Sequence, residues 1–368
     1  MNSELLYQLA LTMVPHVGDA HVKTLIKEFG TASAIFKAKS SKLEKIPGVH
    51  IPAIKSLKEF DDFKLAEKEL QFIEKYKIKP LFLTDPEYPQ RLLNCYDSPS
   101  LLFYKGEANL NTSKVLAIVG TRSYSEYGKQ FTENLIADLA GEEILIISGL
   151  AFGIDTIAHK ASVKNKLKTV GVVGHGLDKI YPSENTSLAK EMIQEGGGIA
   201  SEFFSGTKPD RHNFPLRNRI VAGLSDATIV VETLVKGGSM ITAKLADSYN
   251  RDVFAVPGRT TDKTSSGCNY LIQHNKAMLL NTTEDLLDVM GWKRKKKKKS
   301  QEQRQLFIEL SEDERKIIDL LQGKEFVHID EINIKSGLSS SAAAAAMLNL
   351  ELQNIIASLP GKRYKIIE

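Results

Sequence analysis

"VLAIVGTRSYSEYGKQFTENLIADLAGEEILIIS" (residues 115–148) decides the fold class of this chain. A short apolar run ends in a glycine turn, an amphipathic stretch follows, and a second apolar run closes the segment. This order predicts a strand, a helix and a parallel strand, which together form the βαβ unit of a sheet buried on both faces.

The same alternation continues from residue 114 to residue 290. Apolar runs predict strands at 115–119, 144–148, 169–173, 198–201, 227–231 and 253–256. Apolar residues at three- and four-residue spacing predict helices at 125–140, 184–196 and 239–250. We therefore expect an α/β fold with an extended Rossmann-like, doubly wound, mainly parallel sheet. The proline-punctuated segment 80–110 should add an antiparallel edge to it.

The predicted strands end in glycine or small polar residues. In a doubly wound sheet the carboxyl ends of the strands line one crevice, where backbone N–H groups and helix N-termini can face an anion. One glycine alone usually marks a tight turn, so the repetition from strand to strand is what favours phosphate binding. The first turn lacks the glycine spacing of a dinucleotide fingerprint, and we expect no cofactor. The residues expected to form this phosphate crevice are Ser148, Gly149, Gly153, Gly174, Gly176, Gly237, Gly238 and Ser239.

Composition excludes several classes of protein. No window approaches the roughly 20 apolar residues of a membrane span, and the first residues do not form a secretory signal, so we expect a cytoplasmic protein without membrane insertion. Cys95 and Cys268 lack the spacing of a disulfide framework or a zinc site, so no metal is expected. The net charge is +4, of which residues 293–299 ("KRKKKKK") supply seven positive charges, leaving −3 elsewhere. Such a run predicts a disordered linker that either solubilises the chain or attracts a polyanion.

The basic run separates two of the four predicted parts of the chain. Residues 1–75 predict a helical domain with two hairpins around glycine turns, similar to helix-hairpin-helix elements or to compact structural hairpins. Residues 80–290 form the Rossmann-like domain, and residues 291–304 form the basic linker. Residues 305–368 show the order of a winged helix, in which Ser339 or a neighbouring serine caps the third helix. That helix begins with serine and alanine, which favours a protein-contact module or a degenerate module over one that binds duplex DNA.

Candidate catalytic residues are few. Asp155 and His159 are one helical turn apart, a spacing that more often gives a local hydrogen-bonded pair than a catalytic dyad. His175 and His212 have no recognisable partner acid or nucleophile. Glu232 ends a predicted strand, where it can cap the glycine-rich turn that follows. Binding is therefore the stronger prediction, and we do not expect an enzyme.

The stretch "RHNFPLRNRIVAGLSD" (211–226) concentrates arginine around a Phe-Pro pair. A phenylalanine at such a loop-to-helix junction is either a core residue or an exposed stacking surface. One of Arg217 and Arg219 could reach phosphate while the other pairs with an acid such as Glu232.

These motifs together resemble the DNA-processing protein A family along nearly the whole chain. They are "VGTR" (119–122), "SGLAFGIDTIAHKAS" (148–162), "GHGLDKIYPSEN" (174–185), "NFPLRNRIVAGLS" (213–225), "VVE" with "GGSMITA" (230–243) and "FAVPG" (254–258). The resemblance implies a helical sterile-alpha-motif-like domain, an extended Rossmann domain and a winged helix. It also implies a homodimer that binds single-stranded DNA and loads the RecA recombinase during natural transformation, without established catalysis.

The resemblance implies roles for individual residues. Arg122 would meet a phosphate, Arg211 would contact DNA, and Phe214 would stack on a base. The full set of implied DNA-binding residues is Gly120, Thr121, Arg122, Lys208, Arg211, Asn213, Phe214, Arg217 and Arg219. The candidate dimer patch, whose apolar residues could also be core, is Leu271, Ile272, Met278 and Leu279. The sequence departs from the family at Asn275 and Lys276, where the family usually has glycine and alanine.

Two other functions remain open from sequence. The Rossmann domain also resembles nucleoside-monophosphate phosphoribohydrolases, but "KGGSMITAK" has Ala243 and Lys244 where that family needs an acid. A scaffold that acts only through its winged helix is the third reading, and it predicts that residues 1–290 are dispensable.

Overall fold

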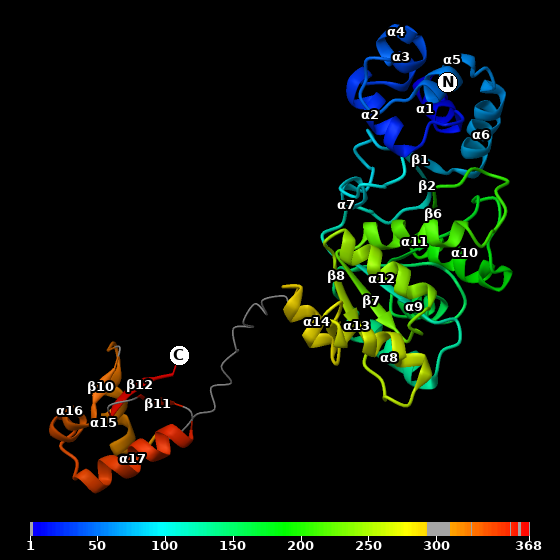
Figure 1. The fold of residues 1–368 in the computed structure, drawn as a ribbon. Helices are drawn as coiled ribbons and strands as arrows, with labels where there is room; N and C mark the ends of the chain where they lie inside the picture. The colour runs from blue at the N-terminus through cyan, green and yellow to red at the C-terminus, as the bar shows by residue number, and fades with distance from the viewer. Residues whose placement is uncertain (1–2, 293–309, 325, 354, 360–361, 368) are drawn as a thin grey trace. The chain divides into compact units, whose positions relative to one another are not determined.

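A computed structural model shows two compact units, residues 1–293 and 294–368. The structure describes residues 3–292, 310–324, 326–353, 355–359 and 362–367 (Figure 1). Of the predicted basic linker, residues 293–304 lie outside the described residues, so its interpretation stays a prediction.

The N-terminal part of the first unit is helical, as expected. Both predicted hairpins are present, because a glycine-containing turn joins the first helix to the second and another joins the fourth to the fifth. The apolar faces of these helices pack on Phe82 and Phe103 of the first two strands, so the helical part and the sheet share a core. The helices are α1 (Ser3–Met13), α2 (Asp19–Phe29), α3 (Ala32–Lys37), α4 (Ser40–Leu43), α5 (Ile51–Glu59) and α6 (Phe63–Tyr76).

The first unit is built on a nine-stranded sheet in the order β1-β2-β6-β5-β4-β3-β7-β8-β9. All six predicted strands are present to within one residue at either end, and the pairs from β6 to β9 are parallel. The predicted antiparallel edge is confirmed by β1 and β2. Only the two-residue β9 was not predicted as a strand. The strands are β1 (Lys79–Phe82), β2 (Leu101–Gly106), β3 (Val115–Gly120), β4 (Leu145–Ser148), β5 (Thr169–Val172), β6 (Gly198–Ser201), β7 (Ala227–Val231), β8 (Asp252–Ala255) and β9 (Met278–Leu279).

Helices cover both faces of this sheet, as the period-two pattern of β3 shows. Its Leu116 and Ile118 pack under α8, α9 and α14, while Ala117 and Val119 pack under α7, α11, α12 and α13. The helices are α7 (Gln90–Leu93), α8 (Glu126–Asp138), α9 (Ile154–Lys164), α10 (Thr186–Gln194), α11 (Asn213–Leu224), α12 (Gly238–Ser248), α13 (Ser266–Gln273) and α14 (Thr283–Val289). The doubly wound architecture predicted from sequence is therefore confirmed.

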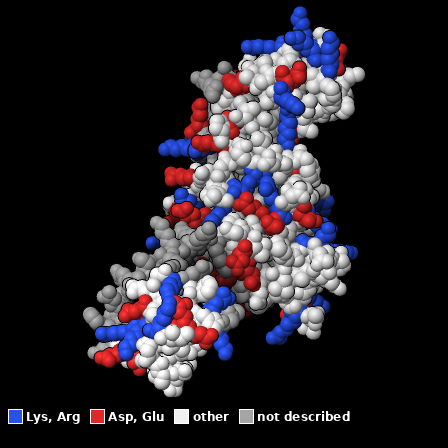
Figure 2. All heavy atoms as spheres, turned by 90° about the vertical axis from the view of Figure 1, so that its left-hand side faces the viewer, with Lys and Arg blue, Asp and Glu red and all other residues white. Residues whose placement is uncertain are grey.

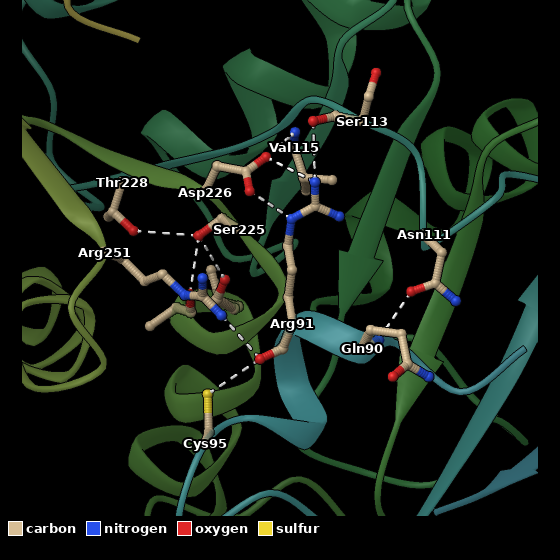
Figure 3. Close-up of polar contacts among 12 residues, drawn as sticks. Gln90, Arg91, Cys95, Asn111, Ser113, Val115, Ser225, Asp226, Thr228 and Arg251 are labelled. Atoms are coloured by element: carbon tan, nitrogen blue, oxygen red, sulfur yellow. Dashed lines mark hydrogen bonds and ion pairs between the residues drawn. The ribbon is translucent and has the colours of Figure 1, made fainter. Parts of the chain in front are cut away.

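An ion pair fastens the connection between β1 and β2 to the amino ends of the central strands. Arg91 of α7 donates from Nε and Nη2 to the two carboxylate oxygens of Asp226, at 2.5 and 2.9 Å (Figure 3). Its Nη2 also donates to the Ser113 carbonyl at 3.1 Å, and Asp226 Oδ2 accepts the Val115 N–H at 2.8 Å. Asp226 thus joins the start of β3, the start of β7 and α7 at the edge of the sheet opposite the glycine-rich strand ends.

The second unit has the predicted winged-helix order. Ser339 caps the third helix by accepting the Ala342 N–H, as expected, and the strands pair in the order β10-β12-β11. The elements are α15 (Glu312–Leu321), β10 (Val327–His328), α16 (Ile329–Lys335), α17 (Ser340–Leu352), β11 (Ile356–Leu359) and β12 (Arg363–Ile366).

Three further features concern the described residues alone. None of their helices is both long enough and apolar enough to span a membrane. Cys95 and Cys268 are buried thiols. No group of three or more His, Cys, Asp or Glu side chains is arranged to hold a metal ion.

Candidate nucleic-acid interface

A crevice of about 520 Å³ lies at the carboxyl ends of β3, β4 and β7, between the first turns of α11 and α12. This is the edge of the sheet at which the sequence predicts an anion site. A smaller pocket beside it adds Gly174. The other predicted residues that line the crevice are Gly120, Thr121, Arg122, Gly149, Arg211, Phe214, Arg217, Gly237, Gly238 and Ser239.

Phe214, in the first turn of α11, lies close to both a cation and a second aromatic ring. The guanidinium carbon of Arg122 is 5.6 Å from the centre of the Phe214 ring. The Tyr181 ring lies on Phe214 with 6.0 Å between ring centres and 26° between ring planes. Phe214 is half-buried, whereas Arg122 and Tyr181 are exposed. We call Phe214 and Tyr181 the aromatic platform. Together with Arg122, the platform presents flat apolar surface and positive charge to the smaller pocket.

Two glycines bring the turns of β3 and α9 into contact. A Cβ atom at Gly120 would lie 2.6 Å from the Ile154 side chain of α9, and one at Gly153 would lie 2.2 Å from the Thr121 carbonyl oxygen. Gly153 also has φ +84°, which disfavours other residues. The Ile154 N–H donates to the same Thr121 carbonyl at 3.2 Å. The backbone that carries Arg122 is thereby fixed, and Gly153 serves this packing instead of the predicted phosphate contact.

Arg217 lies at the crevice but is only 5% exposed. Its Nη1 donates to the carbonyls of Gly149 and Val172. Asp155, which accepts the Gly149 N–H at 3.1 Å, supplies the compensating charge. Burial lowers the pKa of Arg217 and raises the pKa of Asp155, and the charge of each partner opposes the shift of the other. Arg217 therefore supports the crevice from behind, which is the structural alternative considered for it.

Arg219 lies outside the crevice. Its guanidinium donates to the Glu202 carboxylate and the Asp97 carbonyl, and its Nη2 is 3.6 Å from Asp19 Oδ2. The pairing with Glu232 suggested by sequence is wrong. Because its partners are protein groups, Arg219 joins α11 to the N-terminal helices, and we no longer assign it to DNA.

Other predicted residues lie beside the crevice without lining it. Ser148 is fully buried and donates to the Ile118 carbonyl at 2.6 Å, while Gly176 packs against the Phe204 carbonyl. Their assignment to the phosphate crevice is wrong, since neither faces it. Lys208 is exposed in the loop before α11, and Asn213 is the first residue of that helix. Their contacts with DNA stay predictions.

The candidate catalytic side chains have structural partners. The Thr169 hydroxyl donates to the Ile146 carbonyl, so His159 Nδ1, 2.7 Å away, donates to Thr169. The spacing of Asp155 and His159 suggested a hydrogen-bonded pair, but His159 is bonded to Thr169 instead. Burial lowers the pKa of His159 to about 3. His175 Nε2 accepts the Tyr181 N–H at 3.2 Å and so orients the aromatic platform.

Glu232 is held in the left-handed region, with φ 54°, and is 2% exposed. Its carboxylate accepts the Ser125 N–H at 2.8 Å and also the Ser125 hydroxyl. The sequence suggested that Glu232 caps the turn after β7, which is wrong, because it caps the turn before α8.

The positive charge at the crevice comes from individual exposed arginines. Figure 2 shows Lys and Arg side chains interspersed with Asp and Glu over the face that it draws. Arg122 and Arg211 are exposed, and neither is paired with a carboxylate in the part of the chain that the structure describes. They are thus available to an anionic ligand.

The predicted dimer patch divides into two groups. Leu271 is 2% exposed and belongs to the core under α13, with Ile272 packed beside it, so Leu271 as a dimer contact is wrong. Met278 and Leu279 form the edge strand β9 and are 37% and 50% exposed. Only the second group offers an apolar surface.

Four apolar residues of the two pockets were not singled out from sequence. Phe152 and Tyr181 line the smaller pocket, and Leu234 and Ile241 line the crevice; all four are at least 40% exposed. Both aromatic residues stand inside motifs that the sequence already offered, so their ring character was the available signal.

Comparison with known proteins follows the same division of the chain. The model of the family described as DNA recombination-mediator protein A matches residues 79–291, and that of the DprA winged helix domain matches residues 301–362. Protein Smf from Synechocystis sp. is 33% identical over 99% of this chain and 99% of its own length. The chain belongs to the DNA recombination-mediator protein A family. The resemblance drawn from its motifs is therefore confirmed.

Members of the family with solved structures have the same fold. DNA processing protein DprA from Streptococcus pneumoniae is 41% identical over 66% of this chain and 83% of its own length. An X-ray structure of DprA from S. pneumoniae covers 78% of this chain and 98% of its own, with a TM-score of 0.66 and 34% identity. DNA processing protein A from Helicobacter pylori, whose structure is described for its single-stranded DNA binding mode, covers 58% of this chain and 95% of its own. Its TM-score is 0.53 and its identity 31%.

Proposed function

We propose that this recombination mediator binds single-stranded DNA in the crevice, protects it, and loads the RecA recombinase onto it during DNA uptake in the cytoplasm. The observation that carries the proposal is the aromatic platform beside Arg122, with Arg211 exposed on the rim. Bases of any identity stack on aromatic rings while cations hold the backbone, which suits a protein that receives DNA of arbitrary sequence. The H. pylori relative, described as a single-stranded DNA binder, supports it.

A homodimer is part of this proposal. The edge strand β9 leaves Met278 and Leu279 exposed, and unprotected apolar edges of sheets are typical of surfaces that pair with another chain. Two crevices in one dimer would bind a long strand at two points, which raises its affinity through effective concentration.

The test compares fluorescent single-stranded and double-stranded oligonucleotides by anisotropy over a range of salt. We expect preference for the single strand. Arg122→Ala and Arg211→Ala should each weaken binding and reduce the slope of log affinity against log salt by about 0.7, the value for one phosphate contact on a single strand. Lys64→Ala, an exposed lysine of α6, is the matched control and should change neither. Equal affinity for both DNA forms, or unchanged slopes, would overturn the proposal.

The RecA step has its own readout. RecA ATPase activity on a single strand coated with single-strand-binding protein should rise when this protein is added, and Arg122→Ala should remove most of the rise. No stimulation by a protein that binds the strand normally would refute loading and leave binding intact.

Catalysis is not part of the proposal. Glu232, the acid that follows β7, is engaged by the N–H and the hydroxyl of Ser125. Release of adenine from AMP by the purified protein would overturn this point in favour of a phosphoribohydrolase.

A further inference from the structure

A second pocket, of about 880 Å³, opens on the α8 side of the same edge of the sheet. It lies between the first turn of α8 and the loop that joins β8 to α13, and we call it the side pocket. It contains the "PGR" that ends the β8 strand motif, which the crevice leaves unused. The side pocket is lined by Ser125, Tyr127, Pro257, Gly258, Arg259, Thr261, Asp262, Lys263 and Thr264.

Hydrogen bonds fix the walls of the side pocket. The Tyr127 hydroxyl donates to the Pro257 carbonyl at 2.8 Å, which holds its ring across the pocket while 48% of the residue stays exposed. Asn269 holds Gly258 from behind: its Oδ1 accepts the Gly258 N–H at 3.1 Å and its Nδ2 donates to the Gly258 carbonyl at 3.0 Å. The pocket therefore has a fixed aromatic face and a braced loop.

The charges in the side pocket favour an anion. Arg259 and Lys263 are exposed, and neither pairs with a carboxylate among the described residues. Asp262 is the acidic residue of the lining, and its N–H donates to the Arg259 carbonyl at 3.0 Å, which closes the loop between the two cations. The lining thus has two cationic side chains, one acidic side chain and an exposed aromatic ring. Sites that bind a single nucleic-acid strand combine an excess of positive charge with an aromatic ring in this way.

Glu232 links the crevice and the side pocket, because it is hydrogen-bonded to residues that line each of them. Its carbonyl accepts the Thr121 N–H at 2.8 Å, beside Arg122 in the crevice. Its carboxylate holds Ser125 and is 3.4 Å from the Thr264 hydroxyl, both in the side pocket. Because β7 is the single strand between β3 and β8, the strand ends that carry the two sites are about 10 Å apart.

We propose that the side pocket is a second subsite for the same single strand, in which Arg259 and Lys263 contact phosphates and Tyr127 stacks on a base. This inference rests on the proposed function of the crevice. The strand leaves the platform at Arg122, passes over the turn before α8 and enters the side pocket.

The test uses the full chain and a double variant, Arg259→Ala with Lys263→Ala. With a long oligonucleotide the salt slope should fall by about 1.4, so between 50 and 200 mM salt the parent protein should lose about sevenfold more affinity than the variant. Lys64→Ala with Lys68→Ala, on α6, is the matched control and should keep the parent slope. An unchanged slope in the double variant would overturn the proposal.

A second measurement locates the base. Oligonucleotides with 5-iodouracil at successive positions are irradiated in complex, and the cross-linked peptides are identified by mass spectrometry. Cross-links to Tyr127, from positions different from those that reach Phe214, support the subsite; a complex that cross-links only in the crevice refutes it. If the parent protein does not bind single strands at all, the proposed function fails, a result distinct from failure of the side pocket alone.

Discussion

Glu69 of α6 binds Ser205, 136 residues away, through three hydrogen bonds. Its carboxylate accepts the Ser205 N–H at 3.1 and 3.2 Å and the Ser205 hydroxyl at 2.5 Å, and Glu69 is 5% exposed. Ser205 belongs to the loop that leads from β6 to Arg211 and Phe214. The N-terminal helices therefore hold one end of the segment that carries the predicted DNA contacts.

Glu69→Ala should weaken DNA binding although Glu69 does not line the crevice. Loss of a buried acceptor should also lower the free energy of unfolding by about 1–3 kcal/mol. We expect the salt slope to fall as in Arg211→Ala, and the two changes together to do no more than Arg211→Ala alone. Anisotropy at a temperature well below unfolding measures both. Glu67→Ala, exposed on the same helix, is the control, and fully additive effects would contradict the coupling.

Phe214→Ala should weaken single-strand binding by about 1–3 kcal/mol, the value of one stacked base, without changing the salt slope. The reason is that a ring contributes stacking and no counterion release. Titration at several salt concentrations checks it. Because Phe214 is half-buried at the crevice, the melting temperature of the variant should differ little from that of the parent protein. A fall of about 3–5 kcal/mol in the free energy of unfolding is typical of a large-to-small change in a core. Such a fall, with normal DNA binding at low temperature, would show that Phe214 is a core residue.

The edge strand and the core beneath it should respond differently to substitution. Leu279→Asp should give a folded monomer by sedimentation, because Leu279 is exposed on β9. Leu271→Ala should instead lose about 2–5 kcal/mol of unfolding free energy, because Leu271 is buried. A dimer that persists in Leu279→Asp at micromolar concentration would exclude β9 as the contact.

His159 should make the protein sensitive to acid. Burial lowers its pKa from 6.5 to about 3, so the unfolded chain takes up this proton before the folded chain does. The contribution of neutral His159 to the free energy of unfolding is fully present above pH 6.5. It is lost as the pH falls toward 3, by at most about 1.4 kcal/mol per pH unit. His159→Asn keeps a donor for Thr169 and should flatten urea-unfolding free energies between pH 6.5 and 5. Parallel curves for the two proteins would contradict this.

The sheet could be predicted because each buried strand is a short apolar run between turns, a pattern that depends on neighbours in sequence. The position of Arg122 at the crevice could be predicted for a related reason, since the carboxyl ends of parallel strands meet at one edge whatever the order of strands. Phe214 lies in a helix, and its stacking role was implied by the resemblance to the family. The ring of Tyr181 was in a recognised motif, but its contact with Phe214 depends on the path of the loop that His175 orients.

Other features depend on contacts that sequence spacing does not encode. Arg219 has its acid partners on β6's following loop and on α2, and neither is a neighbour in sequence. Leu271 and Leu279 are equally apolar, and only the packing of α13 separates the core residue from the edge residue. The side pocket requires β8 to lie one strand away from β3, which the order of strands along the chain does not reveal.

The Arg91–Asp226 pair gives α11 a mechanical role. The helix begins at the aromatic platform, is tied to the N-terminal helices through Arg219 at its middle, and is followed at once by Asp226, which Arg91 holds at the far edge of the sheet. A DNA strand pulled out of the crevice would pull on the first turn of α11, and the residues that follow the other end of this helix are held by the Arg91–Asp226 pair. In the proposed complex with DNA, such a pull would be transmitted through α11 to Asp226 and the amino edge of the sheet, and not only to the loops around the crevice.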